Sequence, residues 1–189
     1  MAPPVLLLIG PSGTGKTSVV TELVRRNLIA VTPTWTTRPR RPDEDGGCPN
    51  HHFVTEAEFS AREAAGLFLG TVELFGLPYR YGLPPLEVSI GGRVPAVVAR
   101  ASVVGAIAAH HSRHVIWQVE APARRVRAAM VARRSSGAEI HARLRDLDAE
   151  LAAGRALADR VFVNDGRLAA VVDAMAEELG ALRHPELVP

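Results

Sequence analysis

The sequence predicts an α/β fold in which a parallel β-sheet is flanked by helices. Short apolar segments alternate with segments of helical periodicity along the chain, as in parallel sheets covered by helices. The first apolar segment, Val5–Ile9, is followed by the octapeptide Gly-Pro-Ser-Gly-Thr-Gly-Lys-Thr at residues 10–17 and then by helical residues 17–24. The octapeptide matches G-x-x-x-x-G-K-[ST] without a mismatch. A strand, this loop and a helix in that order predict a sheet of the P-loop NTPase type.

The other elements are predicted from periodicity and from residues that begin or end helices. Apolar segments predict strands at residues 27–32, 68–74, 94–99, 115–119 and 160–163. Periodic segments predict helices at residues 56–66, 102–109, 123–133, 139–156 and 168–182. Thr55 is the expected N-cap and Gly66 the expected C-cap of the first of these, and Pro122 is expected at the first helical position of the third. Residues 34–50, rich in proline and glycine, predict a loop, and residues 76–85 a turn-rich crossing.

Length and composition limit the classes of protein that fit. The 189 residues predict one domain, and no apolar run approaches the roughly 18 residues that a membrane span needs. The N-terminus lacks the basic segment of a signal peptide, and a single cysteine, Cys48, can form no internal disulfide. A net charge of +2 is too small to predict binding to nucleic acid. We therefore expect a cytoplasmic protein with neither nucleic acid nor a membrane as its partner.

Lys16 is the one lysine among the 22 basic residues, and it lies in the octapeptide. A P-loop needs a compact ammonium on a flexible stem to reach the β- and γ-phosphates, and the planar guanidinium of arginine has the wrong shape. The backbone N–H groups of the loop cradle phosphate, and the hydroxyl of Thr17 faces Mg²⁺. The sequence thus predicts binding of a nucleoside triphosphate with Mg²⁺ by Gly10, Pro11, Ser12, Gly13, Thr14, Gly15, Lys16 and Thr17.

A second segment, residues 36–47, carries three arginines within four positions: Arg38, Arg40 and Arg41. On a loop stiffened by proline, they could clamp an oxyanion in bidentate fashion. A solvated basic loop is the alternative.

Thr36-Thr37-Arg38-x-x-Arg41, followed by an acid, glycines and x-Phe-Val, resembles the acceptor-binding region of guanylate kinases. The resemblance extends over nearly the whole chain, through the N-terminal P-loop, Tyr81-Gly82, an arginine-bearing lid and Val163-Asn164-Asp165. It implies an acceptor-binding insertion at about residues 34–87 and a lid at about residues 133–140. It also implies transfer of a phosphoryl group from ATP to GMP, with Mg²⁺ as cofactor.

The resemblance assigns roles to individual residues. Arg38, Arg41 and Tyr81 would hold the phosphate of the acceptor, with His51 where a second tyrosine is usual and Thr34 in place of a serine. Asn164 would join the P-loop in binding ATP. Lys16, Arg133 of the lid and Arg143 one turn into the next helix would stabilise the charge of the transition state. No general base is required, because the attacking phosphate oxygen is already anionic.

The residues that would read the base depart from the family pattern. Gly70 stands where a glutamate is usual, Leu83 replaces a serine or threonine, and Arg100 and Ser102 occupy the positions of an Asp-x-Asp segment. A shifted register could still bring in the carboxylate of Glu73. Ser102, which we include among the acceptor-binding residues, is comparable to a serine of the ribose 1,5-bisphosphate phosphokinases, which form PRPP.

The sequence therefore leaves GMP and ribose 1,5-bisphosphate open as acceptors. A non-catalytic guanylate-kinase-like module that holds a phosphorylated ligand is a third reading, against which the P-loop with its lone lysine argues. The oligomeric state stays open. For His110, His111 and His114, solvated positions at a helix end are favoured over a metal site.

Overall fold

The computed structural model describes residues 3–41, 44, 47–73, 79–86 and 91–183. Its central sheet has five strands in the order β2-β7-β1-β8-β9, and every neighbouring pair is parallel. The strands are β1 (Val5–Ile9), β2 (Ile29–Val31), β7 (Val94–Val98), β8 (His114–Glu120) and β9 (Arg160–Val163). The predicted parallel sheet is confirmed, with β1 in the middle of it.

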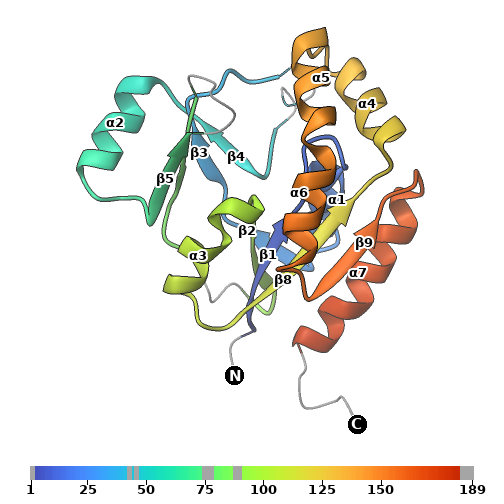
Figure 1. Ribbon diagram of the computed structural model, residues 1–189. Coiled ribbons are helices and arrows are strands. Elements are labelled where there is room, and N and C mark those ends of the chain that lie inside the picture. The colour runs from blue at the N-terminus through green and yellow to red at the C-terminus, as the bar shows by residue number, and fades with distance from the viewer. Residues whose placement is uncertain (1–2, 42–43, 45–46, 74–78, 87–90, 184–189) are drawn as a thin grey trace.

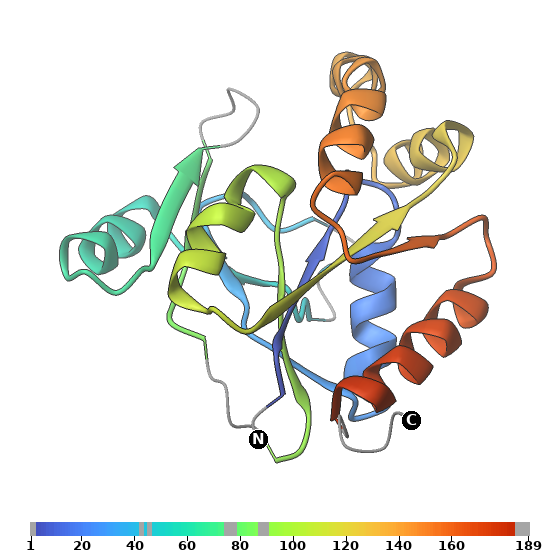
Figure 2. The same cartoon turned by 60° about the horizontal axis from the view of Figure 1, so that its bottom comes forward.

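Helices cover both faces of the central sheet (Figures 1 and 2). On one face, Leu6 and Leu8 of β1 pack against α1 (Lys16–Arg25) and α7 (Leu168–Arg183). On the other face, Leu7 and Ile9 pack with α3 (Val104–His110). Because both faces are buried, β1 is apolar at every position rather than at alternate ones. No helix in the described part of the chain is long and apolar enough to span a bilayer.

Three more helices follow β8 in the chain: α4 (Ala123–Ala132), α5 (Gly137–Arg145) and α6 (Leu147–Arg155). Residues 139–156 were predicted to form one helix, and this is wrong. The chain bends at Asp146, where ψ is −2°, and α5 ends before it while α6 begins after it. Neither proline nor glycine marks this break. Pro122 precedes α4 as its N-cap with ψ 145°, one position earlier than predicted.

The residues that lie in sequence between β2 and β7 form a second sheet, with the strand order β4-β3-β6-β5. Its strands are β3 (Thr34–Thr36), β4 (His51–Phe53), β5 (Gly70–Glu73) and β6 (Arg80–Leu83), and α2 (Glu56–Ala64) lies beside it (Figure 1). Thr55 caps α2 as predicted, in a capping box with Glu58. Gly66 follows the helix with φ +68°, a conformation that favours glycine.

The second sheet corrects two predictions of irregular structure. Residues 34–36 form β3 rather than loop, and residues 80–83 form β6 within the predicted crossing. β3 exists because Trp35 pairs with Gly82 and Thr36 with Tyr81, partners more than forty positions away in the chain. Leu74 and residues 76–78, for which we predicted a strand end and a turn, lie outside the described residues.

Candidate active site

A cavity of about 200 Å³ brings residues of both sheets and of α5 together. Twelve polar or glycine positions singled out by the sequence line it: Gly10, Ser12, Lys16, Thr34, Arg38, Arg41, His51, Gly70, Tyr81, Gly82, Arg100 and Arg143. They come from the P-loop, from the second sheet with the loop after β3, from the segment after β7, and from α5. Arg133, Asn164 and Ser102 do not line this cavity.

Residues 10–15 join β1 to α1 with a backbone in which Gly10, Gly13 and Gly15 all have positive φ. Gly10 has φ +137°, and a Cβ there would lie 2.2 Å from the carbonyl oxygen of Val119. Gly15 has φ +95°, and a Cβ there would lie 2.4 Å from Nδ2 of Asn164. That Nδ2 atom donates a hydrogen bond of 2.9 Å to the carbonyl oxygen of Thr14. Asn164 therefore fixes the P-loop from behind, outside the cavity.

The ammonium of Lys16 folds back onto its own loop. Its Nζ donates to the carbonyl oxygens of Gly10 at 2.5 Å and Pro11 at 2.7 Å. Burial, with the nearby charge of Arg100, lowers the pKa of Lys16 to about 7. Cations crowded in this way are stabilised when an anion binds among them, because a nearby opposite charge favours the charged form.

Two arginines that follow β8 in the chain, Arg133 and Arg143, interact with the P-loop. NH1 of Arg143 in α5 donates to Oγ of Ser12 at 2.6 Å, which joins this helix to the P-loop. Burial and the charge of Arg41 lower the pKa of Arg143. Arg133 is the C-cap of α4, and its charge contributes to the lowered pKa of Lys16. Both arginines thus lie within electrostatic reach of the P-loop or of its neighbours.

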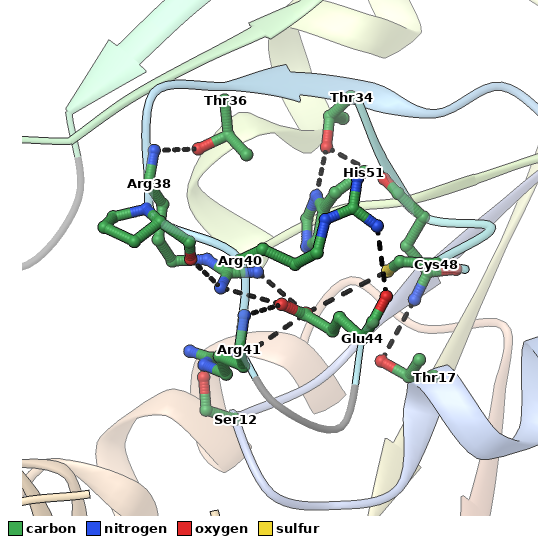
Figure 3. Close-up of polar contacts among 12 residues, drawn as sticks. Ser12, Thr17, Thr34, Thr36, Arg38, Arg40, Arg41, Glu44, Cys48 and His51 are labelled. Carbon is green, nitrogen blue, oxygen red and sulfur yellow. Dashed lines mark hydrogen bonds and ion pairs between the residues drawn. The ribbon is translucent and has the colours of Figure 1, made fainter. Parts of the chain in front are cut away.

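Glu44 organises the arginines of the loop after β3 (Figure 3). Its carboxylate accepts from Arg38 through NH1 at 3.0 Å and NH2 at 2.8 Å, and from the backbone N–H of Arg41 at 2.9 Å. The side chains of Arg38 and Glu44 are both 7% exposed, so this is a buried ion pair. Glu44 was not among the predicted site residues. Its signal in the sequence is an acid six positions after Arg38.

His51 lies on β4 beside Thr34 of β3. Nδ1 of the ring and Oγ1 of Thr34 are 2.8 Å apart, and Oγ1 also donates to the carbonyl oxygen of Asn50 at 3.1 Å. Burial and the charge of Arg38 lower the pKa of His51 to about 4, so the imidazole is neutral near pH 7. The ring of Tyr81 is 6.1 Å away, centroid to centroid.

The rest of the lining is mostly apolar. It includes Leu69, Val72, Leu83, Val97, Val98, Ala99, Val103, Ala106 and Ile107. No aspartate or glutamate, Glu73 included, is among the described residues that line the cavity. A Cβ on Gly70 would meet no atom within 4 Å. The alternative in which Glu73 supplies a carboxylate therefore finds no support in this geometry.

Ser102 lines a second cavity, of about 350 Å³, on the side of the P-loop facing α6. Arg100 lines both cavities and binds Oε1 of Glu150 at 2.9 Å. The structure thus does not bring Ser102 to the predicted acceptor residues. Glu120, at the end of β8, accepts hydrogen bonds from Nε of Arg155 at 2.6 Å and from Nη2 of Arg155 at 2.5 Å. This ion pair joins the end of β8 to α6.

Thr17 stands in the first turn of α1, where the predicted metal would lie. Its Oγ1 accepts a hydrogen bond of 3.1 Å from Nδ2 of Asn50, whose Oδ1 is buried and has no hydrogen-bond partner in the described part of the chain. Among the described residues, no group of three or more histidines, cysteines or acids could hold a metal ion. Mg²⁺ takes few protein ligands and binds through oxygen, phosphate and water, so a hydroxyl beside a phosphate-binding loop fits it.

Comparison with known proteins gives one consistent result. A segment of 70 residues is 47% identical to the guanylate kinase of Alkalilimnicola ehrlichii, and covers 36% of this chain and 34% of that protein. A segment of 96 residues is 40% identical to the guanylate kinase of Bifidobacterium longum, and covers 49% of this chain and 48% of that protein. The matches thus span between a third and a half of the relatives. No family model matches the chain.

The fold comparison extends further along the chain. The crystal structure of guanylate kinase from Anaplasma phagocytophilum superposes with a TM-score of 0.71, over 96% of this chain and 87% of that chain, at 23% sequence identity. At this identity the likeness concerns the fold. The chain therefore resembles the guanylate kinases, in sequence over less than half of its length and in fold over nearly all of it.

Proposed function

We propose that the chain is an ATP-dependent kinase that phosphorylates an existing phosphate group, with GMP as acceptor, giving GDP and ADP. One observation carries the proposal: a single cavity is lined by Lys16 of the P-loop, by Arg38 and Arg41 of the loop after β3, and by Arg143 of α5. A donor phosphate at Lys16 and an acceptor phosphate at Arg38 and Arg41 would then meet in one cavity. The names of the similar proteins support the choice of GMP.

Phosphoryl transfer needs positioning and charge rather than covalent participation by the protein. In this proposal the backbone of residues 10–15 cradles the phosphates of ATP, and Asn164 keeps that backbone in place. Lys16, Arg143 and Arg133 stabilise the negative charge of the group in flight. Mg²⁺ beside Thr17 neutralises charge on the phosphates of ATP. Arg41, Arg38, Tyr81 and His51 orient the acceptor phosphate, whose anionic oxygen attacks without a general base.

Residues 34–87 are the acceptor-binding insertion in this proposal, and residues 133–140 the lid. Arg134, within the lid, has φ +58°, and Ser136 and Glu139 form a capping box that starts α5. Arg143 is in the second turn of that helix, so a movement of residues 133–136 would carry its guanidinium toward or away from Ser12. A cytoplasmic location is also part of the proposal, supported by the single cysteine of the chain.

A second candidate is ribose 1,5-bisphosphate as acceptor, with PRPP as product. The observation in its favour is the cavity lining itself, which holds Arg100 and, among the described residues, no carboxylate. Guanine presents N1–H and N2–H₂ donors, and an unmatched buried donor costs about 1–3 kcal/mol. An acceptor without a base has no such donors to satisfy. Ser102 is a weaker argument for this acceptor, because it lines the other cavity.

The test is release of ADP from ATP with GMP, AMP, dGMP, UMP and ribose 1,5-bisphosphate in parallel, using Lys16→Ala as the inactive control. Turnover with GMP well above that with the other acceptors supports the first proposal. Turnover with ribose 1,5-bisphosphate alone replaces it by the second. Binding of GMP without turnover, in a protein that also fails to bind ATP, would leave the non-catalytic module as the reading.

A further inference from the structure

Asn50 is a buried polar residue that contacts both β3 and the first turn of α1. It is 2% exposed, and it directly precedes His51 of β4. Its Nδ2 donates to Oγ1 of Thr17 in α1 at 3.1 Å, while its Oδ1 has no hydrogen-bond partner among the residues that the structure describes. A buried amide oxygen without a donor costs free energy, so such an atom calls for a functional explanation.

The explanation lies in the chemistry of the hydroxyl. A threonine hydroxyl has one proton and two lone pairs, and a metal ion takes a lone pair. A hydroxyl oxygen that bound Mg²⁺ would be a better donor and a poorer acceptor. An asparagine amide has nearly the same shape in its two orientations, so a half-turn of the Asn50 amide would put Oδ1 where it accepts a hydrogen bond from this hydroxyl. Partners of this kind orient metal ligands and tune their affinity for the metal.

We propose that Asn50 is a positioning residue of the magnesium site: its amide holds the hydroxyl of Thr17, and would accept a hydrogen bond from that hydroxyl when Mg²⁺ is bound. The inference rests on the proposed function, because it requires Mg²⁺ with a nucleotide at the P-loop. It concerns a residue that our reading of the sequence did not assign to the metal or to either substrate.

The backbone of Asn50 extends the same contact to the acceptor side. Its carbonyl oxygen accepts from the backbone N–H of Thr34 at 3.0 Å and from Oγ1 of Thr34 at 3.1 Å. Thr34 in turn contacts Nδ1 of His51. One residue thus joins the hydroxyl at the metal to the two strands that carry the acceptor-side residues Thr34 and His51.

The experiment measures the dissociation constant of ADP by calorimetry, once with excess Mg²⁺ and once with EDTA. The constant in EDTA divided by the constant in Mg²⁺ measures how much the metal strengthens ADP binding. In Asn50→Ala we expect this ratio to fall by about tenfold, while the constant in EDTA stays as in the wild type. In Asn50→Asp, whose carboxylate accepts but does not donate, the ratio stays at least as large as in the wild type.

Asn164→Ala is the matched control. Asn164 is also a buried asparagine that contacts the P-loop, and it is 3% exposed. Its amide, however, donates to the backbone carbonyl of Thr14 rather than to a hydroxyl. This variant should weaken ADP binding equally with and without Mg²⁺ and leave the ratio unchanged. Thr17→Val should lower the ratio as Asn50→Ala does, and the double variant should lower it no further, since the two residues act as one unit.

Three results would overturn the inference: a wild-type ratio in Asn50→Ala, losses that multiply in the double variant, or a ratio in Asn50→Asp about tenfold below that of the wild type. The last arm decides the matter even where the alanine variant does not fold. The electron paramagnetic resonance spectrum of bound Mn²⁺·ADP gives a second readout, which should change in Asn50→Ala and not in Asn164→Ala. A wild type whose ADP binding ignores Mg²⁺ refutes the metal site of the proposed function itself, and this inference with it.

Discussion

The P-loop side of the cavity is one continuous octapeptide between β1 and α1, whereas the side proposed to bind the acceptor is assembled from three short strands and a loop. The five residues of β1 are all buried, and they pair with β7 and β8 on either side. β3 and β4 have three residues each, and most of their side chains are only half-buried. The first site is held by the core of the protein, and the second by a few contacts between distant residues.

The second site also depends on one ion pair. Glu44 holds the guanidinium of Arg38 and the backbone of Arg41 together. On the P-loop side, by contrast, the shape is set mainly by the glycine backbone and by Asn164, and Lys16 adds hydrogen bonds to two carbonyl oxygens. Replacing Lys16 should therefore remove activity with little effect on the fold. In the loop after β3, replacing Glu44 should destabilise the fold, and replacing Arg41 should weaken use of the acceptor.

The largest effect is expected for Lys16. Replacement by alanine or by arginine should lower kcat by at least about 10²–10³-fold, because a charge that stabilises the transition state is lost or displaced. Arginine fails as well, since the Nζ atom fits between two carbonyl oxygens at 2.5 and 2.7 Å, a space too small for a guanidinium. Steady-state kinetics measure the loss, and thermal unfolding should be nearly that of the wild type. Near-normal turnover of Lys16→Arg would contradict the assignment.

The loop after β3, which carries Arg38, Arg41 and Glu44, gives the contrasting case. Glu44→Gln should lower the free energy of unfolding by up to about 3–5 kcal/mol, because it leaves the buried charge of Arg38 without its partner. Arg41→Ala is the control: its guanidinium is 3.9 Å from Glu44, so stability should change little, while kcat/KM for the acceptor falls by about one to two decades. Denaturant unfolding and acceptor kinetics separate the two effects. If Arg41→Ala lowered kcat/KM equally for ATP and for the acceptor, Arg41 would not be a residue that binds the acceptor phosphate.

Selectivity for the base should be weak, because the described lining of the cavity holds no carboxylate that could accept hydrogen bonds from guanine. A site that hydrogen-bonds its substrate rejects the wrong one by several decades, and one that relies on shape manages only about one or two. We expect GMP to exceed AMP in kcat/KM by no more than that. Gly70→Glu should widen the gap, since its Cβ would enter open space. A preference of about four decades in the wild type would mean that other residues read the base.

The smallest effect concerns pH. With a pKa of about 7 in the free protein, Lys16 is partly neutral above pH 7, and bound phosphate raises this pKa. The bound state therefore holds more protons, so binding takes up protons and weakens as pH rises. Between pH 7 and 8 the dissociation constant of the nucleotide should rise about fivefold. Calorimetry in buffers of different ionisation enthalpy measures the uptake, and Lys16→Met should abolish it.

The same contrast explains what the sequence could predict. The P-loop and β1 were predictable because their pattern is contiguous and each residue type has a local reason. β3 and β6 were not, since Thr34–Thr36 becomes a strand only by pairing with distant residues. The break at Asp146 had no proline or glycine to mark it.

The candidate site divides along the same line. Arg38, Arg41, His51 and Tyr81 were predicted by resemblance, and they do line the cavity with Lys16. Glu44 and Asn50 were missed, because their roles arise only from contacts that form on folding. Ser102 lines the other cavity, since the turn at Ala101–Val103 directs it toward α6 rather than toward the arginines.

The position of the chain's one lysine also has a consequence for chemical labelling. Amines react with acylating reagents in their neutral form, and Lys16 is partly neutral near pH 7, whereas an ordinary lysine is almost fully protonated there. Since no other side chain in the sequence carries an amine, a single added acyl group on a peptide containing residue 16 reports the P-loop alone. Protection of that amine by a bound nucleotide turns the mass of one peptide into a gauge of site occupancy.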